Sequence, residues 1–376
     1  MRQSRLEISI ENLRHIEVAY SEGAAGRVLY EVWSRFEAAL TSEIWQVTTE
    51  PWGVSLQFSE SHGDVWGELE AALHAVALRP VKVDGVGIVV GLYCGAHRPE
   101  DWGGLASMFD LSRYRSDMQA VAAAYSALAD GWTLFAEQVV TDAAEPPVTL
   151  YRECLLRLSD EDGQLLMPAD YIPAMERLGL TRAFDRQIVG KVLAELCRRP
   201  GDALGCNLSA LSATKDLWWH SLLSELALDR DLASRLVIEI TETAMPSSIQ
   251  QAAAFVAAIR ATGARIAIDD YGTGFSSASF TQRGCVDIVK IDGSFVGLSA
   301  SQGEAALRHL VLQANVLGQD VVIEGVETEA DLQVARRAGA RWFQGYFVGK
   351  PVCSAMMLAE QWPEPEPGQI GGVRIQ

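Results

Sequence analysis

The chain contains 376 residues, of which 31 are basic and 49 acidic, so its formal net charge is −18 and its isoelectric point lies near 4.8. Hydrophobic residues make up 49% and charged residues 21%, the balance of an ordinary globular protein, and the length suggests two domains. Such a negative charge argues against a nucleic-acid partner, because proteins that bind phosphate backbones usually present a basic face. It does not exclude a small anion held by metal ions, since a metal site needs carboxylates.

Cysteine spacing and hydropathy indicate a reduced, cytoplasmic protein. The six cysteines are scattered and form no C-x-x-C pair, so neither a zinc ribbon nor a disulfide framework is expected. No run approaches the roughly 18 apolar residues of a membrane span, and the N-terminus lacks the apolar core of a signal peptide. We therefore expect a cytoplasmic chain with no membrane segment.

The first 140 residues predict an α/β sandwich. In chain order, hydrophobic periodicity predicts a strand at 5–10, a helix at 24–40, strands at 44–50 and 53–59, a helix at 64–77, a strand at 86–94 and a further helix. This order is a βαββαβ arrangement. A helical pattern continues from Met118 to Val140, and the composition break at 141–147 (TDAAEPP) predicts the linker between two domains.

Residues 148–362 predict an α/β fold with a (β/α)8-type, TIM-like barrel. Apolar runs that alternate with amphipathic helices are typical of parallel sheets. The predicted strands lie at 148–158, 203–209, 235–242, 264–270, 288–292, 320–327 and 342–348, with helices such as 250–262 and 304–317 between them. One strand per helix over about 215 residues suits a barrel. The tail at 363–376 is rich in Pro and Gly.

Polar side chains end six of these predicted strands. They are Asn207, Glu239, Asp269 with Asp270, Lys290, Glu324 and Gln344. A single acid at a strand end is more often a helix N-cap or a solvated loop residue, but six such strand ends are hard to explain by capping. In a parallel barrel the C-terminal strand ends meet on one rim, so we expect these groups to share one pocket.

The residue types in this pocket indicate bound metal. Carboxylates so close together repel unless cations neutralise them. All six histidines lie away from these strand ends, and oxygen ligands favour Mg²⁺ or Mn²⁺ over zinc. Two such ions are the usual machinery for in-line attack on a phosphodiester.

The second domain resembles the EAL family of cyclic di-GMP phosphodiesterases over roughly Val148–Cys353. The motifs in family order are Glu153-Cys154-Leu155, Asn207-Leu208-Ser209, Glu239-Ile240-Thr241-Glu242, Asp269-Asp270-Tyr271-Gly272-Thr273-Gly274, Lys290-Ile291-Asp292, Glu324-Gly325-Val326-Glu327 and Gln344-Gly345-Tyr346. Cys154 replaces the usual alanine. A thiol beside Glu153 also raises the hypothesis of oxidative inhibition.

The resemblance implies hydrolysis of cyclic di-GMP to linear pGpG by water attack in a two-metal site that holds Mg²⁺ or Mn²⁺. It implies the metal ligands Glu153, Asn207, Glu239, Asp269 and Asp270. Lys290 would contact a metal-bound water or the phosphate, and Glu324 would be the general base, so that Glu153, Lys290 and Glu324 form the catalytic set. Substrate contacts would come from Leu155, Arg157, Glu327 and Gln344, and Glu242 would anchor the loop after Asp270.

Two alternatives stay open at this point. Lys290 can also be interpreted as a strand-end cation paired with Asp270. The domain can also be interpreted as a receptor that binds cyclic di-GMP without hydrolysis and signals through the N-terminal domain. The resemblance further implies a homodimer formed through the EAL domain.

The first domain resembles a degenerate GGDEF (diguanylate cyclase) domain that would regulate the second. Only Asn12 of the first family motif is kept, and Ser9 stands where a metal-binding Asp is expected. The signature turn falls at 52–56, where Val54 and Ser55 occupy the two acidic positions. A cyclase needs Mg²⁺, which neither side chain can hold, so we expect no cyclase activity. A scaffold role is favoured, and a sensory site for GTP is left open.

Overall fold

The computed structural model describes residues 3–41, 45–50, 53–59, 65–95, 110–241, 248–273, 286–297 and 304–353. The described chain forms two compact units, one from the residues up to Thr133 with Leu158–Phe184, and one from Leu134–Arg157 with the residues from Asp185 onward. The expected loop anchor Glu242 and the tail at 363–376 lie outside the described residues.

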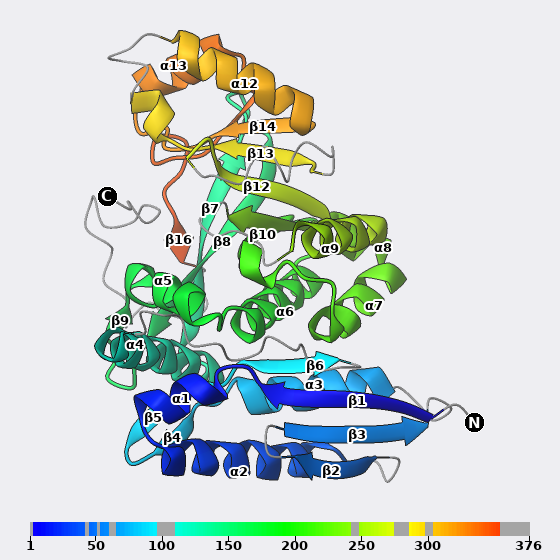
Figure 1. Ribbon diagram of the computed structural model, residues 1–376. Coiled ribbons are helices and arrows are strands. Elements are labelled where there is room, and N and C mark those ends of the chain that lie inside the picture. The colour runs from blue at the N-terminus through cyan, green and yellow to red at the C-terminus, as the bar shows by residue number, and fades with distance from the viewer. Residues whose placement is uncertain are drawn as a thin grey trace. The chain divides into compact units, whose positions relative to one another are not determined.

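The N-terminal unit contains a four-stranded antiparallel sheet with helices running alongside it (Figure 1). The strand order is β2(Gln46–Glu50), β3(Gly53–Ser59), β1(Gln3–Ile10), β6(Leu92–Gly95). The helices are α1(Leu13–Ala19), α2(Glu22–Ala39), α3(Val65–Ala77), α4(Leu111–Asp130) and α5(Pro168–Leu178). The predicted strands at 5–10, 44–50 and 53–59 correspond to β1, β2 and β3, the predicted helices at 24–40 and 64–77 correspond to α2 and α3, and α1 is an additional helix.

One predicted strand of this unit is divided in two. The run at 86–94 forms β5(Val86–Ile88), which pairs with β4(Val81–Val83), and β6, which pairs with β1. Between them the Asn12 side chain takes the place of a strand partner. Its amide donates to the Val89 carbonyl at 2.9 Å and accepts from the Gly91 N–H at 3.0 Å. The buried backbone is therefore satisfied without a continuous ladder.

The helical pattern expected from Met118 to Val140 ends at Asp130. Gly131 adopts φ 83°, the left-handed conformation that ends many helices, and Thr133 already begins β7(Thr133–Thr141). Within the N-terminal unit, α4 packs against α5, where Arg177 donates to both carboxylate oxygens of Asp117 at 2.9 and 2.7 Å.

The second unit is built around a ring of eight strands among the described residues. Its order is β7, β15(Trp342–Phe343), β14(Asp320–Ile323), β13(Ile288–Ile291), β12(Arg265–Tyr271), β11(Leu236–Thr241), β10(Leu204–Ser209) and β8(Thr149–Ser159), and pairing between β7 and β8 closes the ring. Strands β8 and β10 to β15 are parallel, as the sequence predicts. The short strands β9(Leu165–Leu166) and β16(Val352–Cys353) extend the sheet from β8 and β7.

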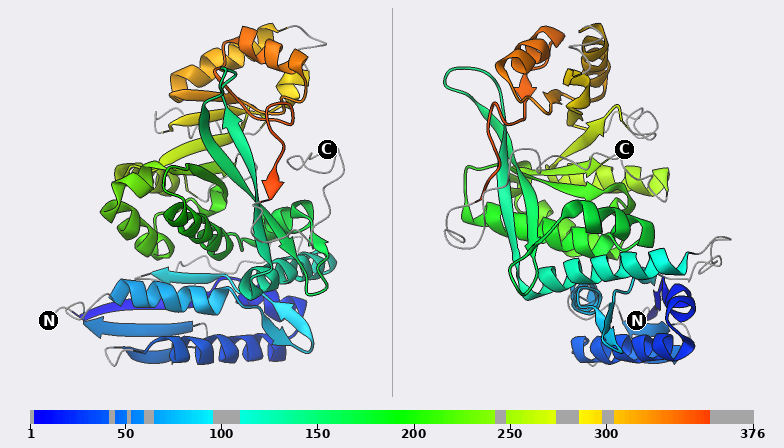
Figure 2. Two further views of the ribbon diagram at one scale, coloured as in Figure 1. Left: turned by 180° about the vertical axis from the view of Figure 1, so that it is seen from behind. Right: turned by 90° about the vertical axis from the view of Figure 1, so that its left-hand side faces the viewer.

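Strand β7 is the exception, because it is antiparallel to β15. It also runs opposite to β8, since hydrogen bonds join Asp142 to Val148 at one end and Ser159 to Trp132 at the other. Figure 2 shows the two long strands side by side. The segment at 141–147, expected as an interdomain linker, therefore connects two strands of one sheet, and the chain passes between the compact units near Thr133.

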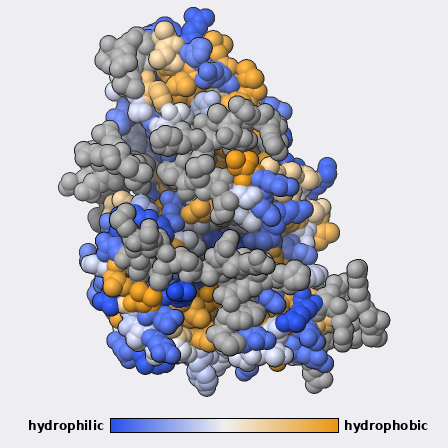
Figure 3. Space-filling view, in the orientation of Figure 1, coloured by the Kyte–Doolittle hydropathy of each residue, from blue (hydrophilic) through white to orange (hydrophobic). Residues whose placement is uncertain are grey.

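Helices surround the barrel on the outside (Figure 1). They are α6(Arg182–Arg198), α7(His220–Leu228), α8(Arg230–Ser234), α9(Ile249–Thr262), α12(Ala305–Leu317) and α13(Glu329–Ala338), with 3-10 turns at Ala210–Ser212 and Leu217–Trp219. Hydrophobic residues reach the surface over α12, where Leu312 and Val316 are 58% and 83% exposed (Figure 3). Among the described residues, no helix has the length and apolar composition of a membrane span.

An apolar layer fills the interior of the barrel. It consists of Val140, Tyr151, Val237, Ala267, Ile288, Val322 and Trp342, one from each of seven strands. All seven side chains are buried, as expected for a barrel whose interior is a packed core. The polar residues at the strand ends lie directly above this apolar layer, which we call the apolar floor.

Candidate metal centre above the barrel core

A polar layer lies directly above the apolar one. Side chains alternate along a strand, so the residue two positions after each apolar floor residue faces the same way. The resulting pairs are Tyr151 and Glu153, Val237 and Glu239, Ala267 and Asp269, Ile288 and Lys290, Val322 and Glu324, and Trp342 and Gln344. The expected convergence of these strand ends is therefore present in the structure.

Lys290 occupies the middle of this layer and is fully buried. Its Nζ lies 2.6 Å from Glu239 Oε2, 2.8 Å from Glu324 Oε1, 2.9 Å from Asp269 Oδ1 and 3.2 Å from Glu153 Oε2. Burial opposes its charge, but the surrounding carboxylates hold its pKa well above the usual value. The alternative interpretation of Lys290 as a partner of Asp270 is not what these contacts show.

Glu153 is the most firmly held carboxylate of the layer. Asn207 Nδ2 donates to its Oε1 at 2.7 Å, and Gln344 Nε2 donates to its Oε2 at 2.6 Å. Burial favours the neutral acid, yet the Lys290 ammonium and these amide donors lower the pKa of Glu153 below its usual value. Glu153 is therefore an ionised and oriented oxygen donor.

The other carboxylates of the layer share the single Lys290 ammonium. Burial and the neighbouring Glu153 raise the pKa of Glu239 well above its usual value, and burial likewise raises the pKa of Asp269 and Glu324. Lys290 contacts Glu239 Oε2 and Asp269 Oδ1, but Glu239 Oε1 is buried and has no hydrogen-bond or ion-pair partner in the described structure. A buried carboxylate oxygen is costly without a partner, so this one points to a further cation.

Asp270 joins the cluster through an unusual backbone. On alternation alone it would face away from Asp269, but its φ is 55° and the register between β12 and β13 shifts at this point. Asp is among the few residues that tolerate this left-handed conformation, whose strain is typical of functional sites. The Asp269 charge, with burial as a second cause, raises the pKa of Asp270 to about 7.

These residues fit divalent cations. Two groups offer ligand oxygens within 4.8 Å of one another, namely Glu153 with Glu239 and Asp269, and Asp269 with Asp270 and Glu324. Four carboxylates contact the Lys290 ammonium, and Asp270 lies beside Asp269 and Glu324. When all six groups are ionised, four negative charges are in excess, which is the charge that two divalent cations would balance. An all-oxygen donor set suits hard ions.

The predicted substrate contacts lie at different depths. Arg157 and Leu155 are partly exposed, and Glu327 is exposed. Burial and the Glu327 carboxylate raise the pKa of Tyr346, and the Arg157 guanidinium opposes the rise. Gln344, by contrast, is 4% exposed and donates to Glu153. Its place is inside the polar layer.

The two thiols beside the site face away from this layer. Cys154 and Cys206 are buried and free, and burial raises the pKa of both thiols. A protonated, buried thiol is a poor target for oxidants, which weakens the hypothesis of oxidative inhibition.

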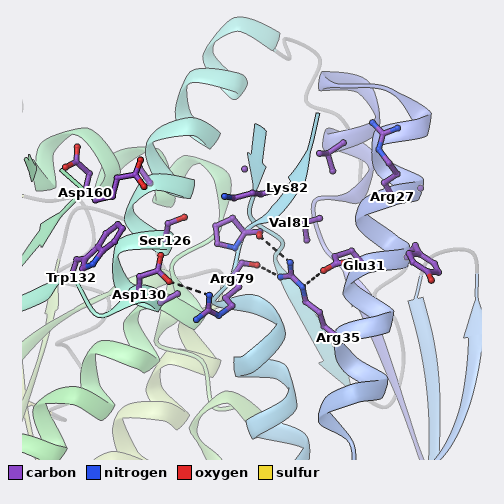
Figure 4. A pocket seen from close by; sticks show the side chains of 18 of the residues that line it. Arg27, Glu31, Arg35, Arg79, Val81, Lys82, Ser126, Asp130, Trp132 and Asp160 are labelled. Atoms are coloured by element: carbon purple, nitrogen blue, oxygen red, sulfur yellow. Dashed lines mark hydrogen bonds and ion pairs between the residues drawn. The ribbon is translucent and has the colours of Figure 1, made fainter. Parts of the chain in front are cut away.

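A second concave region lies in the N-terminal unit. It is a groove of about 990 Å³ between α2, the β4–β5 hairpin and the end of α4. Figure 4 shows two of the pairs among its charged side chains: Arg35 Nε lies 2.9 Å from Glu31 Oε1, and Arg79 Nη1 lies 3.5 Å from Asp130 Oδ1. None of the described lining residues has a buried polar atom without a partner, so we assign this groove no function.

The fold and the site together define a class of protein: an α/β barrel with a carboxylate cluster at its C-terminal rim that can hold divalent cations. The EAL domain family matches residues 122–351, which is more than half of the chain. The protein therefore belongs to the EAL domain family, as the motifs predict.

Several relatives carry functional names. The chain is 30% identical over 211 residues to cyclic di-GMP phosphodiesterase PdeF of Escherichia coli K12, covering 54% of this chain and 28% of the relative. It is 31% identical over 218 residues to the bifunctional diguanylate cyclase/cyclic di-GMP phosphodiesterase MucR of Pseudomonas aeruginosa, covering 55% and 31%. The chain thus spans about a third or less of the length of these relatives.

Solved structures share the fold. The Pseudomonas aeruginosa MucR phosphodiesterase in complex with cyclic di-GMP matches with a TM-score of 0.54 and 26% identity, covering 62% of this chain and 97% of that one. The apo S helix-GGDEF-EAL structure of Vibrio cholerae LapD matches with a TM-score of 0.57 and 18% identity, covering 92% and 89%. The second likeness concerns the fold alone.

Proposed function

We propose that this protein hydrolyses cyclic di-GMP to linear pGpG with two Mg²⁺ or Mn²⁺ ions. The observation that carries the proposal is the polar layer, in which Glu153, Glu239, Asp269 and Glu324 contact one ammonium and Asp270 lies beside Asp269 and Glu324. The names of relatives such as PdeF and the cyclic di-GMP complex of MucR support this substrate.

Each side chain of the layer has a proposed role that follows from its position. Glu153, Asn207, Glu239, Asp269 and Asp270 would hold the ions, which supply charge neutralisation at the phosphodiester when bound. Glu324 would accept the proton of the attacking water, since a carboxylate with a raised pKa is a better base near neutral pH. Lys290 would add a fixed positive charge beside the reacting phosphate.

The rim residues would orient the substrate. The guanidinium of Arg157 can bind two phosphate oxygens at once, and its charge opposes the rise in the pKa of Tyr346. Leu155 and Glu327, which are less buried than the metal-binding layer, would contact the remainder of the dinucleotide. Gln344 would act by orienting Glu153.

The direct test is a product assay with cyclic di-GMP and Mg²⁺ or Mn²⁺. We expect pGpG from the wild-type chain and loss of turnover in Glu153→Ala. Glu137→Gln is a matched control, because Glu137 lies on the neighbouring strand β7 and binds Arg199 at 2.7 and 3.1 Å outside the polar layer. Full activity in Glu153→Ala would reject the assignment. Binding of cyclic di-GMP with Mg²⁺ but without turnover would instead favour the receptor alternative.

We further propose that the N-terminal unit is a degenerate, catalytically inactive GGDEF-like domain that regulates the barrel. The LapD likeness over 92% of the chain supports its fold. Ser9 and Ser55, at positions where a cyclase needs carboxylates, are buried hydroxyls. We expect no cyclic di-GMP from GTP. Adding GTP to the phosphodiesterase assay tests a sensory role, and light scattering tests the expected homodimer.

A further inference from the structure

The eighth strand of the barrel also contributes to the polar layer. Strand β7 places Val140 in the apolar floor, but it runs antiparallel to its neighbour β15. On such a strand the residue above the floor is two positions earlier in the chain, which is Gln138. Gln138 is 8% exposed, so its amide is buried at the level of Glu153 and Gln344.

Hydrogen bonds fix the orientation of this amide. Gln138 Nε2 donates to the Gly349 carbonyl at 3.0 Å, which leaves its Oε1 to face Gln344. Gln344 Nε2 donates to that oxygen at 3.3 Å and to Glu153 Oε2 at 2.6 Å. The chain of contacts therefore runs from the Gly349 backbone through two amides to a carboxylate of the site.

The order of donors and acceptors in this chain matters. If the Gln344 amide turned over, its oxygen would face the Glu153 carboxylate, and two acceptors would meet in a buried place. Gln138 Oε1 accepts a hydrogen bond only when the Gln344 Nε2 group faces it. It therefore favours the orientation in which Gln344 also donates to Glu153. A neutral amide at 138 also adds no further negative charge to the cluster.

We propose that Gln138 is a positioning residue, which acts through Gln344 to hold the Glu153 carboxylate in the orientation that binds a divalent cation. The inference rests on the proposed function for its catalytic consequence, but its effect on cation binding stands on the contacts alone. Partners that orient a metal ligand are commonly worth about 10- to 100-fold in metal affinity, and we expect an effect of this size.

The experiment is a titration of the metal-depleted full chain with Mn²⁺ alone, in which binding is measured by calorimetry or electron paramagnetic resonance. Gln138→Leu should weaken Mn²⁺ binding about 10- to 100-fold. Glu137→Gln, one residue away on the opposite face of β7, should leave the affinity within about 2-fold, because Glu137 accepts its hydrogen bonds from Arg199 and, among the described residues, forms none with Gln344 or Glu153. If Gln138→Leu does not fold, Gln138→Met offers a side chain of similar length without donor or acceptor.

A double-mutant cycle separates positioning from general stability. If Gln138 acts through Gln344, then Gln138→Leu should cause no further loss of Mn²⁺ affinity in a Gln344→Ala background. Equal losses in both backgrounds, or unchanged affinity in Gln138→Leu, would overturn the inference. A wild-type chain that binds Mn²⁺ and shows the coupling but does not cleave cyclic di-GMP would reject the proposed function and leave this inference standing.

In the cleavage assay the same variant has a distinct signature. The Mn²⁺ concentration required for half-maximal turnover should rise in Gln138→Leu, whereas KM for cyclic di-GMP at saturating Mn²⁺ should remain close to the wild-type value. A change in KM without a change in the metal requirement would place Gln138 at the substrate and contradict the proposed route through Glu153.

Discussion

Replacing Asp270 by asparagine should stabilise the metal-free protein against unfolding. In the presence of Mg²⁺ the same substitution should make the protein less stable than wild type. Asp270 has a left-handed backbone, φ 55°, that asparagine also tolerates, so the substitution changes the charge with little change in backbone strain. The Asp269 carboxylate, with burial as a second cause, raises the pKa of Asp270 from 3.8 to about 7. The folded chain therefore binds this proton more tightly than the unfolded chain.

The sign and size follow from proton linkage. Between about pH 4 and pH 7 the folded state carries more protons at Asp270, so the free energy of unfolding falls as pH rises. A difference of about 3 pKa units, at 1.36 kcal/mol each, sets an upper limit of about 4 kcal/mol above pH 7. The Asp270→Asn variant has no such penalty, because the amide side chain does not ionise.

The assay is urea denaturation of wild type and Asp270→Asn with a chelator, at about pH 5 and about pH 8. The variant should gain stability over wild type mainly at the higher pH, and added Mg²⁺ should reverse the order. Asp202→Asn is the control, since it changes a partly exposed carboxylate of the same unit that lies 3.5 Å from Arg199 Nη1. An unchanged difference between the two pH values in Asp270→Asn would refute the reasoning.

Three further outcomes are expected. Gly205→Ala would place a Cβ 2.4 Å from Glu239 Oε1, so it should destabilise the barrel by about 1–3 kcal/mol and weaken Mn²⁺ binding; an unchanged urea midpoint would contradict this packing. Arg177→Ala leaves the Asp117 carboxylate between α4 and α5 without its bidentate partner and should cost about 1–3 kcal/mol, measured by hydrogen exchange in α4. The buried Cys154 should react with a thiol reagent only on unfolding, whereas the exposed Cys197 and Cys353 should react in the native chain, and peroxide should leave turnover unchanged; rapid labelling of Cys154 itself in the native chain, located by peptide mass mapping, would revive oxidative control.

The parallel strands of the barrel were predictable because each carries two signals at once. An apolar residue such as Val237 or Val322 is followed two positions later by an acid, so the same alternation that defines the strand also places the acid in the interior. Periodicity therefore predicted both the strands and most of the residues that the structure brings together.

The sequence pattern did not predict strand β7 or the role of Gln138, because β7 is antiparallel to its neighbour β15. The pattern that ends parallel strands in a polar residue is reversed in an antiparallel strand, where Gln138 precedes Val140. The apolar alternation near Val140 also follows α4 after only a short turn at Gly131, so it was interpreted as a continuation of the helix. A search for polar residues two positions before an apolar one would have found it.

Two other features depend on contacts that no local pattern contains. Asp270 reaches the cluster only because its φ is positive and the register shifts beside it. The division of the run at 86–94 depends on the side chain of Asn12, more than 70 residues away in sequence. Such tertiary effects override local propensity, so sequence reasoning identified the ligand candidates but not the backbone that orients them.

The buried Lys290 ammonium affects the conditions under which the barrel can fold. Lys290 is covalently part of the barrel and contacts four carboxylates within 3.2 Å, so it acts as a built-in counter-ion. Because the chain itself relieves part of the repulsion, we expect the barrel to fold without divalent ions. Mg²⁺ or Mn²⁺ would then bind to a chain that is already folded.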